Sequence, residues 1–285
     1  MIFLIRWAQR SLPARPALQH FRLLLGGLII FSWAGFASAI QVQEPALRFA
    51  LNEGAGTAVL DSSSAKVAGE LKGSGAGWTV DVPAAFSSGS AYSCDGSRGS
   101  RIAIEAEASD AISLLEDFTI TCWLNMRDPS NLRRILSKMD LKHASFFDFR
   151  LAEAAEGKIK FLLALRTGSI LDNGYAQKGF EIVSEDCELP LGWLFVAVTR
   201  DSNSGLVSFY FGGEDPSTDL VASIGTGDGP KGVILDNKAA LMIGNIQVNL
   251  GRAANADFSD LRIYTEVLSS ETIEAVRLQN FKPEP

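Results

Sequence analysis

The sequence predicts an all-β fold in which two antiparallel sheets pack against each other as a sandwich. About a dozen short segments carry the alternation of apolar and polar residues that is typical of half-buried strands. Clusters of Gly, Ser, Asn and Asp separate these segments, as between residues 201 and 205. No helical pattern joins successive strands, which excludes a parallel α/β sheet because parallel strands need crossover connections.

The clearest predicted strand covers residues 118–126. Phe118, Ile120 and Cys122 fall on one face, whereas Thr119 and Trp123 fall on the other. A period of two therefore predicts one buried face and one partly polar face. The other predicted strands are, in chain order, residues 46–51, 101–105, 133–138, 146–151, 158–166, 180–184, 193–200, 206–211, 220–224, 240–243 and 258–264.

A short C-terminal helix is predicted over residues 270–280. Ser269 precedes it as an N-cap, and Glu271 in the first turn favours the positive end of the helix dipole. Leu268 and Ile273 have the spacing of a hydrophobic staple. We expect this helix to act as a terminal clasp at a sheet edge.

The N-terminus has the layout of a secretory signal peptide, residues 1–39. Arginines and no acidic residues occupy positions 6–22, an apolar run covers 23–36, and Ala37-Ser-Ala39 offers a cleavage site. We predict cleavage after Ala39; the alternative is an uncleaved membrane anchor. Either outcome leaves the domain outside the cytoplasm, so it is predicted to be periplasmic, cell-surface or extracellular.

Residues 40–285 are predicted to form one domain with a strongly acidic surface. Four of the 26 basic residues and none of the 33 acidic ones precede residue 40, so this part carries a formal net charge of −11. Such a balance excludes nucleic acid and anionic membranes as partners, because phosphate binding needs clustered Lys and Arg. We expect no membrane insertion once the leader is removed.

The strand sequences resemble the laminin-G-like, concanavalin A-like jelly-roll family, in the branch that includes the pentraxins. Four segments match the family in the same order. They are Leu47-Arg-Phe-Ala-Leu-Asn-Glu-Gly-Ala-Gly56 with Asp61; Phe118-Thr-Ile-Thr-Cys-Trp123 with Ile135-Leu-Ser-Lys138; Trp193-Leu-Phe-Val-Ala-Val-Thr-Arg-Asp201 with the hairpin to Gly213; and Phe258-Ser-Asp-Leu-Arg-Ile-Tyr264. The resemblance implies a two-sheet antiparallel jelly roll and an extracellular recognition module, binding glycans or proteins and often holding Ca²⁺.

For calcium and for the cysteines, the resemblance gives two expectations. The pentraxin-type calcium ligands are replaced by apolar residues in 244–251. Asp61 and Asp260 are instead candidates to hold a structural Ca²⁺ with backbone carbonyls; the alternative is that Asp61 caps a turn. The family also places the strand of Cys122 near the strand that Cys187 precedes, which makes these two the first candidates for a disulfide, with burial of all three cysteines as the alternative.

Four side chains are candidates for ligand binding. Trp123, Tyr175 and Tyr210 are aromatics that could stack on sugar rings, with core packing as the alternative for Trp123. Tyr175 follows a turn and is the better surface candidate. Asp148 alternates with Phe147 and Phe149 and is expected to face a groove.

Catalytic motifs are weak in this sequence. Glycosidases on jelly rolls use paired carboxylates, and the nearest pair, Glu105 and Glu107, lacks a third acid at the expected place. His143 has neither a nucleophile motif nor a second metal ligand beside it. The sequence therefore predicts a non-catalytic module that binds carbohydrate; the alternatives are a protein-binding or adhesion module and, third, a divergent glycan hydrolase or lyase.

Overall fold

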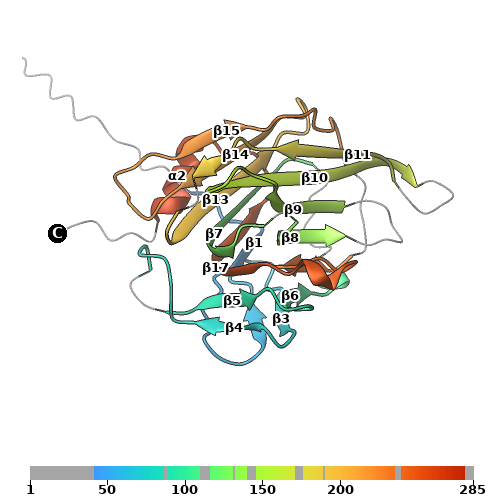
Figure 1. Ribbon diagram of the computed structural model, residues 1–285. Helices are drawn as coiled ribbons and strands as arrows, with labels where there is room; N and C mark the ends of the chain where they lie inside the picture. The colour runs from blue at the N-terminus through green and yellow to red at the C-terminus, as the bar shows by residue number, and fades with distance from the viewer. Residues whose placement is uncertain are drawn as a thin grey trace, which may run out of the picture. The chain divides into compact units, whose positions relative to one another are not determined.

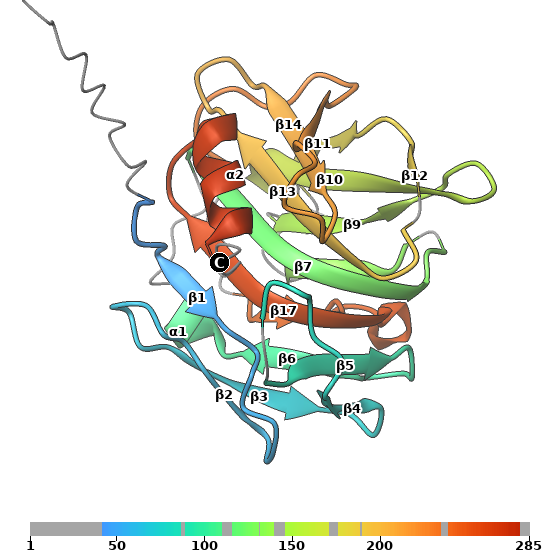
Figure 2. The same ribbon diagram turned by 90° about the vertical axis from the view of Figure 1, so that its left-hand side faces the viewer.

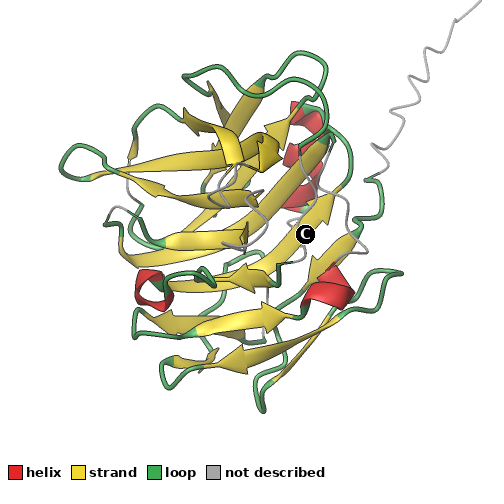
Figure 3. Ribbon diagram, turned by 90° about the vertical axis from the view of Figure 1, so that its right-hand side faces the viewer, coloured by secondary structure: helices red, strands yellow, loops and turns green. Residues whose placement is uncertain are grey.

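The computed structural model describes residues 42–86, 89–109, 116–130, 132–139, 146–170, 176–188, 190–234 and 239–279. They belong to one compact unit, and strands make up most of it (Figure 3). Two antiparallel sheets face each other, as the sequence predicts (Figure 1). No helix in these ranges is both long and apolar enough to cross a lipid bilayer.

The first sheet, here sheet A, has eight strands in the order β15-β14-β13-β7-β17-β5-β4, with β1 paired to β17. Their bounds are β1 (Leu47–Phe49), β4 (Ala76–Thr79), β5 (Ala91–Asp95), β7 (Phe118–Asp128), β13 (Trp193–Arg200), β14 (Val207–Gly212), β15 (Val221–Ile224) and β17 (Asn255–Tyr264). Long-range pairing of β7 with both β13 and β17 makes it the central strand of the sheet.

The second sheet, sheet B, has nine strands in the order β11-β10-β9-β8-β16-β6-β3-β2, with β12 paired to β10. Their bounds are β2 (Ala58–Leu60), β3 (Ala68–Lys72), β6 (Arg101–Ile104), β8 (Arg134–Met139), β9 (Phe146–Ala152), β10 (Lys158–Ile170), β11 (Ala176–Val183), β12 (Cys187–Glu188) and β16 (Leu241–Ile243). The helical pieces are α1 (Ala106–Ser109), the 3-10 turn η1 (Leu250–Arg252) and α2 (Ser270–Leu278).

The main core lies between the sheets and follows the predicted alternation. Phe118, Ile120 and Cys122 of β7 point into it together with Phe149 and Phe161 of sheet B, all fully or almost fully buried. Stacked aromatic pairs bridge the sheets, as between Phe161 and Phe211, whose ring centroids are 5.3 Å apart. Burial of this large apolar surface is the main stabilising contribution to the fold.

A second, smaller core lies on the outer face of sheet A, beneath α2 (Figure 2). Ile273 and Val276 of the helix pack onto Trp123, Trp193 and other outward-facing side chains of the sheet. Ser269 caps the helix by accepting a hydrogen bond from the Thr272 N–H, as predicted. The helix thus covers a sheet face, whereas the sequence predicted a clasp at the sheet edge.

The predicted disulfide does not form, and Cys94, Cys122 and Cys187 are all free thiols. Cys122 lies in β7 of sheet A opposite Val196, whereas Cys187 lies in β12 of sheet B opposite Ile159. The two cysteines therefore belong to different sheets, and the main core lies between them. Cys122 is fully buried, and this burial raises the pKa of its thiol well above the usual value. For Cys122 the structure therefore supports the alternative, a small side chain packed in the core.

Candidate functional site

A bulge in β17 creates the most distinctive local geometry on the outer face of sheet A. Ser259 pairs with Trp123 and Arg262 with Thr121, so β17 carries one residue more than β7 between these positions. Asp260 takes a left-handed backbone conformation there, with φ of +46°. Its N–H donates to the Ala50 carbonyl at 3.1 Å, so the end of β1 holds the bulge in place. Because such backbone is unfavourable for an L-residue, the surrounding contacts must hold it.

Asp260 is almost fully buried, and two arginines bind its carboxylate. Arg262 donates to both of its oxygens, with the Nε at 3.1 Å from each, and Arg48 Nε donates to Oδ1 at 2.9 Å. Burial lowers the pKa of the Arg262 guanidinium, but the nearby carboxylate of Asp260 more than offsets this and leaves it raised. Arg48 and Arg262 are direct partners in the β1–β17 pairing, which brings both guanidinium groups to one carboxylate.

Residues 81–86, together with residues 89 and 90, form a wall above this part of β17. Asp81 accepts hydrogen bonds from Asn125 Nδ2 at 3.0 Å and from Trp193 Nε1 at 3.3 Å. The Ala84 N–H donates to Glu214 Oε1 at 2.6 Å. These contacts fix the wall to sheet A and place the half-buried Phe86 against the outer core.

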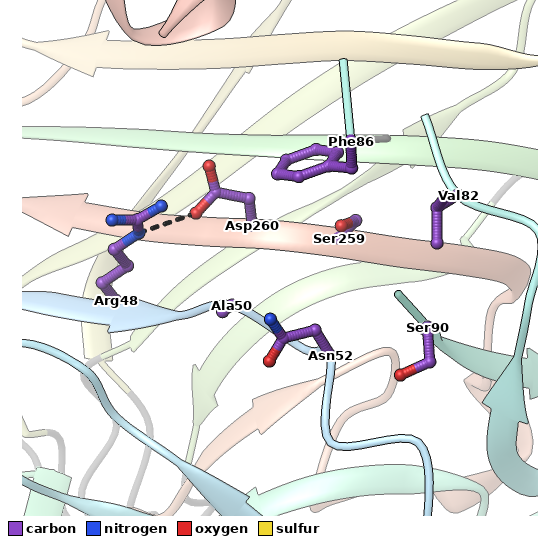
Figure 4. A pocket seen from close by; sticks show the side chains of 8 residues that line it. All are labelled: Arg48, Ala50, Asn52, Val82, Phe86, Ser90, Ser259 and Asp260. Atoms are coloured by element: carbon purple, nitrogen blue, oxygen red, sulfur yellow. Dashed lines mark hydrogen bonds and ion pairs between the residues drawn. The ribbon is translucent and has the colours of Figure 1, made fainter. Parts of the chain in front are cut away.

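The wall, β1 and β17 enclose a cavity of about 160 Å³, here called the β1–β17 pocket (Figure 4). Its lining combines one aromatic ring with hydroxyl, amide, guanidinium and carboxylate groups: Arg48, Ala50, Asn52, Val82, Phe86, Ser90, Ser259 and Asp260. In Figure 4 the Phe86 ring lies above Asp260 and Ser259, and Asn52 and Ser90 lie on the other side. The Ser90 Oγ is buried without a hydrogen-bond partner, so one donor in this pocket is unused. The pocket can take one small polar ring.

The structure brings the two predicted calcium ligands to the same residue, Arg48, but they bind different groups of it. Asp61 accepts from the Arg48 N–H at 2.9 Å, and also from Ser63 N–H, Ser63 Oγ and the Val67 N–H. Asp260 binds the guanidinium of the same Arg48. No cluster of three or more His, Cys, Asp or Glu in the described ranges could hold a metal ion. The donor set fits a turn cap and an ion-pair cluster, and it does not fit calcium, which needs six to eight oxygens.

This geometry makes a prediction for calcium. We expect the same melting temperature in millimolar Ca²⁺ and in chelator, because the oxygens of Asp61 and Asp260 are already satisfied by N–H and O–H donors. Thermal unfolding followed by circular dichroism measures it. A rise with Ca²⁺ that the Asp61→Asn variant removes would show instead that these carboxylates bind the ion.

Asp148 lies on the outer face of sheet B and does not face an open groove. It is 1% exposed, and it binds Arg134 at 2.9 Å and Arg150 at 3.4 Å. Burial raises its pKa, with the two arginines acting in the opposite direction. A ligand could reach this carboxylate only by displacing an arginine, so the structure gives Asp148 an ion-pairing role.

The three aromatic residues predicted to bind a ligand differ in where they lie. Trp123 does lie on the outward face of β7, but α2 covers that face, and the side chain is 1% exposed. Its ring makes an edge contact with Phe195, with centroids 5.4 Å apart, and its burial closes the ring to a sugar. Tyr210 is half-buried at the margin of the same core. Tyr175 and His143 lie outside the described residues.

Of the residues that line the β1–β17 pocket, the sequence pattern points to Asp260 alone. Phe86 and Ser90 lie in segments that carry no motif, and Asn52 lies in the first family-like segment without a predicted role. Only the fold brings these three residues beside residue 260. Asp260 was singled out as a metal ligand, and the structure places it in this pocket with a different set of partners. The one usable signal is the break in alternation at Ser259-Asp260, where two polar residues follow each other within the strand.

The family model for the concanavalin A-like lectin/glucanases superfamily, in its laminin G type, matches residues 96–274. That span covers more than half of the chain, so the protein belongs to this family, and the predicted jelly roll is confirmed. No curated protein sequence matches the chain.

Solved structures share this fold. The binding domain of botulinum neurotoxin DC, determined in complex with rat synaptotagmin II, is 12% identical with a TM-score of 0.54, over 83% of this chain and 52% of that one. Domain 4 of an extracellular arabinanase from Geobacillus stearothermophilus, determined with arabinotriose, is 15% identical with a TM-score of 0.52, over 82% and 99%. The binding domain of Paraclostridial mosquitocidal protein 1 is 13% identical with a TM-score of 0.55, over 82% and 51%. The chain spans about half the length of the two toxin domains, and at these identities the likeness concerns the fold.

Proposed function

We propose that this chain is an exported, non-catalytic recognition module that binds carbohydrate in the β1–β17 pocket. The observation that carries the proposal is the meeting of one aromatic face with several polar groups in a single small cavity. Sugar rings stack their C–H faces on aromatic rings, while amides, hydroxyls and charged groups bind their hydroxyls. Phe86, Asn52 and Ser90 supply these groups here. The arabinotriose complex of the arabinanase domain supports the proposal as an example of the fold holding a saccharide.

Binding without hydrolysis is part of this proposal. Glycoside hydrolysis generally uses two carboxyl groups on opposite sides of the scissile bond. Among the residues that line the pocket, Asp260 is the single carboxylate, and two arginines hold it. Its place in an ion-pair cluster suits recognition better than proton transfer.

A glycan array with the purified chain tests the proposal. We expect Phe86→Ala and Asn52→Ala each to lower the affinity for the bound glycan by about tenfold or more, which equals about 1.4 kcal/mol. Phe180→Ala and Asn203→Ala are matched controls, because they remove a half-buried phenylalanine and an exposed asparagine far from the pocket lining. Equal losses in the controls, or no binding to any glycan, would contradict the proposal.

Export rests on the signal-peptide pattern of residues 1–39. We expect N-terminal sequencing of the protein recovered from outside the cytoplasm to begin at Ile40, because Ala37 and Ala39 are the small residues that signal peptidase requires. A chain that keeps Met1 in the membrane fraction would support the anchor instead.

A protein ligand is the second candidate, favoured by the edge strand β15. Val221 and Ile224 are 63% and 68% exposed on this strand, whose one neighbour among the described strands is β14. An exposed apolar edge can add a strand from another protein. The synaptotagmin complex of the neurotoxin domain is an example of this fold with a protein partner.

A further inference from the structure

The guanidinium of Arg48 has more hydrogen-bonding capacity than its neighbours use. Its Nε donates to Asp260, and in the described part of the chain its two terminal nitrogens make no hydrogen bond. The side chain is 31% exposed, so these nitrogens remain within reach of a ligand. A free guanidinium fork offers parallel N–H donors with the spacing of a carboxylate.

The charge of Asp260 is already matched without Arg48. Arg262 binds both oxygens of this carboxylate and is buried beside it, with a side chain only 2% exposed. Asp61 contacts the backbone N–H of Arg48 and other donors of its own turn, and does not bind the guanidinium. Among the described residues of this cluster, Arg48 is therefore the cation with capacity left for a further anionic group.

The remaining groups of the pocket suit a ligand that carries both an acid and hydroxyls. The Ser90 Oγ is buried without a partner, and the residue is 8% exposed. It can donate to a ligand oxygen or accept from a ligand hydroxyl. Asn52, exposed beside it, offers an amide with both donors and acceptors, and Phe86 supplies an apolar face.

From these contacts we infer that the β1–β17 pocket selects a sugar that carries a carboxylate, with Arg48 binding the acid and Asn52 and Ser90 binding hydroxyls. This inference rests on the proposed function and narrows its substrate class to acidic saccharides. The acidic composition of the chain, with a net charge of −7, opposes general binding of polyanions. Acid recognition must therefore be local to Arg48.

The test compares oligouronates and sialyl-lactose with their carboxyl-reduced neutral counterparts by isothermal titration calorimetry. We expect at least one acidic saccharide to bind tenfold or more tightly than its neutral counterpart. Arg48→Gln should remove this preference, and Arg48→Lys should recover only part of it, because an ammonium is a point charge and lacks the planar fork.

Arg48 also holds Asp260, so a variant that leaves this ion pair intact is needed. Asn52→Asp adds a negative charge at the pocket with almost no change in size and should lower the affinity for the acidic saccharide at least tenfold. Asn203→Asp adds the same charge in a distant turn and should change it less than twofold. If the neutral counterpart bound equally or more tightly, the acid preference would be overturned. If Phe86→Ala still abolished that binding, the carbohydrate site would nevertheless be supported. If no acidic saccharide and no neutral counterpart bound, both the acid preference and the carbohydrate site would be overturned.

Discussion

Replacing Arg277 by alanine is expected to lower the free energy of unfolding by about 3–5 kcal/mol, as removal of one partner from a buried charged network generally does. Arg277 is fully buried in α2. Its guanidinium donates to the carbonyls of Gly213 and Thr218, both at 2.7 Å, and pairs with Glu274. Loss of this side chain leaves those acceptors without partners and frees α2 from the loop that follows β14.

Denaturant unfolding followed by tryptophan fluorescence measures this change, because α2 covers two tryptophans. Arg277→Lys should recover less than half of the lost stability, since one ammonium cannot replace the separate contacts of Nε and both terminal nitrogens. Arg98→Ala removes an exposed arginine from a turn and should change stability by less than about 0.5 kcal/mol. A small effect of Arg277→Ala would mean that these contacts do not anchor α2 to the loop that follows β14.

Trp123→Ala is expected to destabilise the fold by about 3–5 kcal/mol, the usual cost of emptying a tryptophan site in a core. The side chain is buried between β7 and α2, where it contacts Phe195 and lies in the same cluster as Ile273. Its removal leaves a cavity that a sheet and a capped helix cannot easily close. Chemical denaturation of the variant and of the unchanged protein gives the difference.

Trp78→Ala is the matched control for this substitution. Trp78 is a half-buried tryptophan in the edge strand β4, and its Nε1 donates to the Gly56 carbonyl at 3.0 Å. We expect it to cost clearly less than Trp123→Ala, because part of its surface stays in water. If Trp123→Ala instead left stability unchanged and abolished ligand binding, a sugar-stacking role for Trp123 would be correct.

The sequence predicted the long central strands well and the N-terminal strands poorly. All twelve predicted strands form, because each carries several apolar side chains with a period of two, as β7 and β13 do. Strands β2 to β5 and the two-residue β12 were missed. β3 reads AGELK and β4 reads AGWT, with too few apolar positions to show a period, and long-range pairing with β6 and β5 makes them strands.

The site was harder to predict than the fold, for a physical reason. The alternation in residues 118–126 placed Trp123 correctly on the second face of its strand, but it did not show that α2 would cover that face. The bulge at Asp260 depends on pairing with both β1 and β7, which no local pattern encodes. Phe86 and Asn52 line the same pocket only because tertiary contacts bring their segments together. Their spacing along the chain therefore carries no signal for this pocket.

Carbohydrate binding in the β1–β17 pocket is tested most directly by mapping where a saccharide binds. Two-dimensional NMR of the isotopically labelled chain, titrated with the glycan that the array selects, reports each perturbed amide. We predict saturable shifts at Asn52, Phe86 and Ser90 and in the neighbouring Ser259 and Asp260. Shifts confined to the outer face of sheet B around Asp148, or to the β15 edge, or no shift with any glycan of the array, would contradict the account.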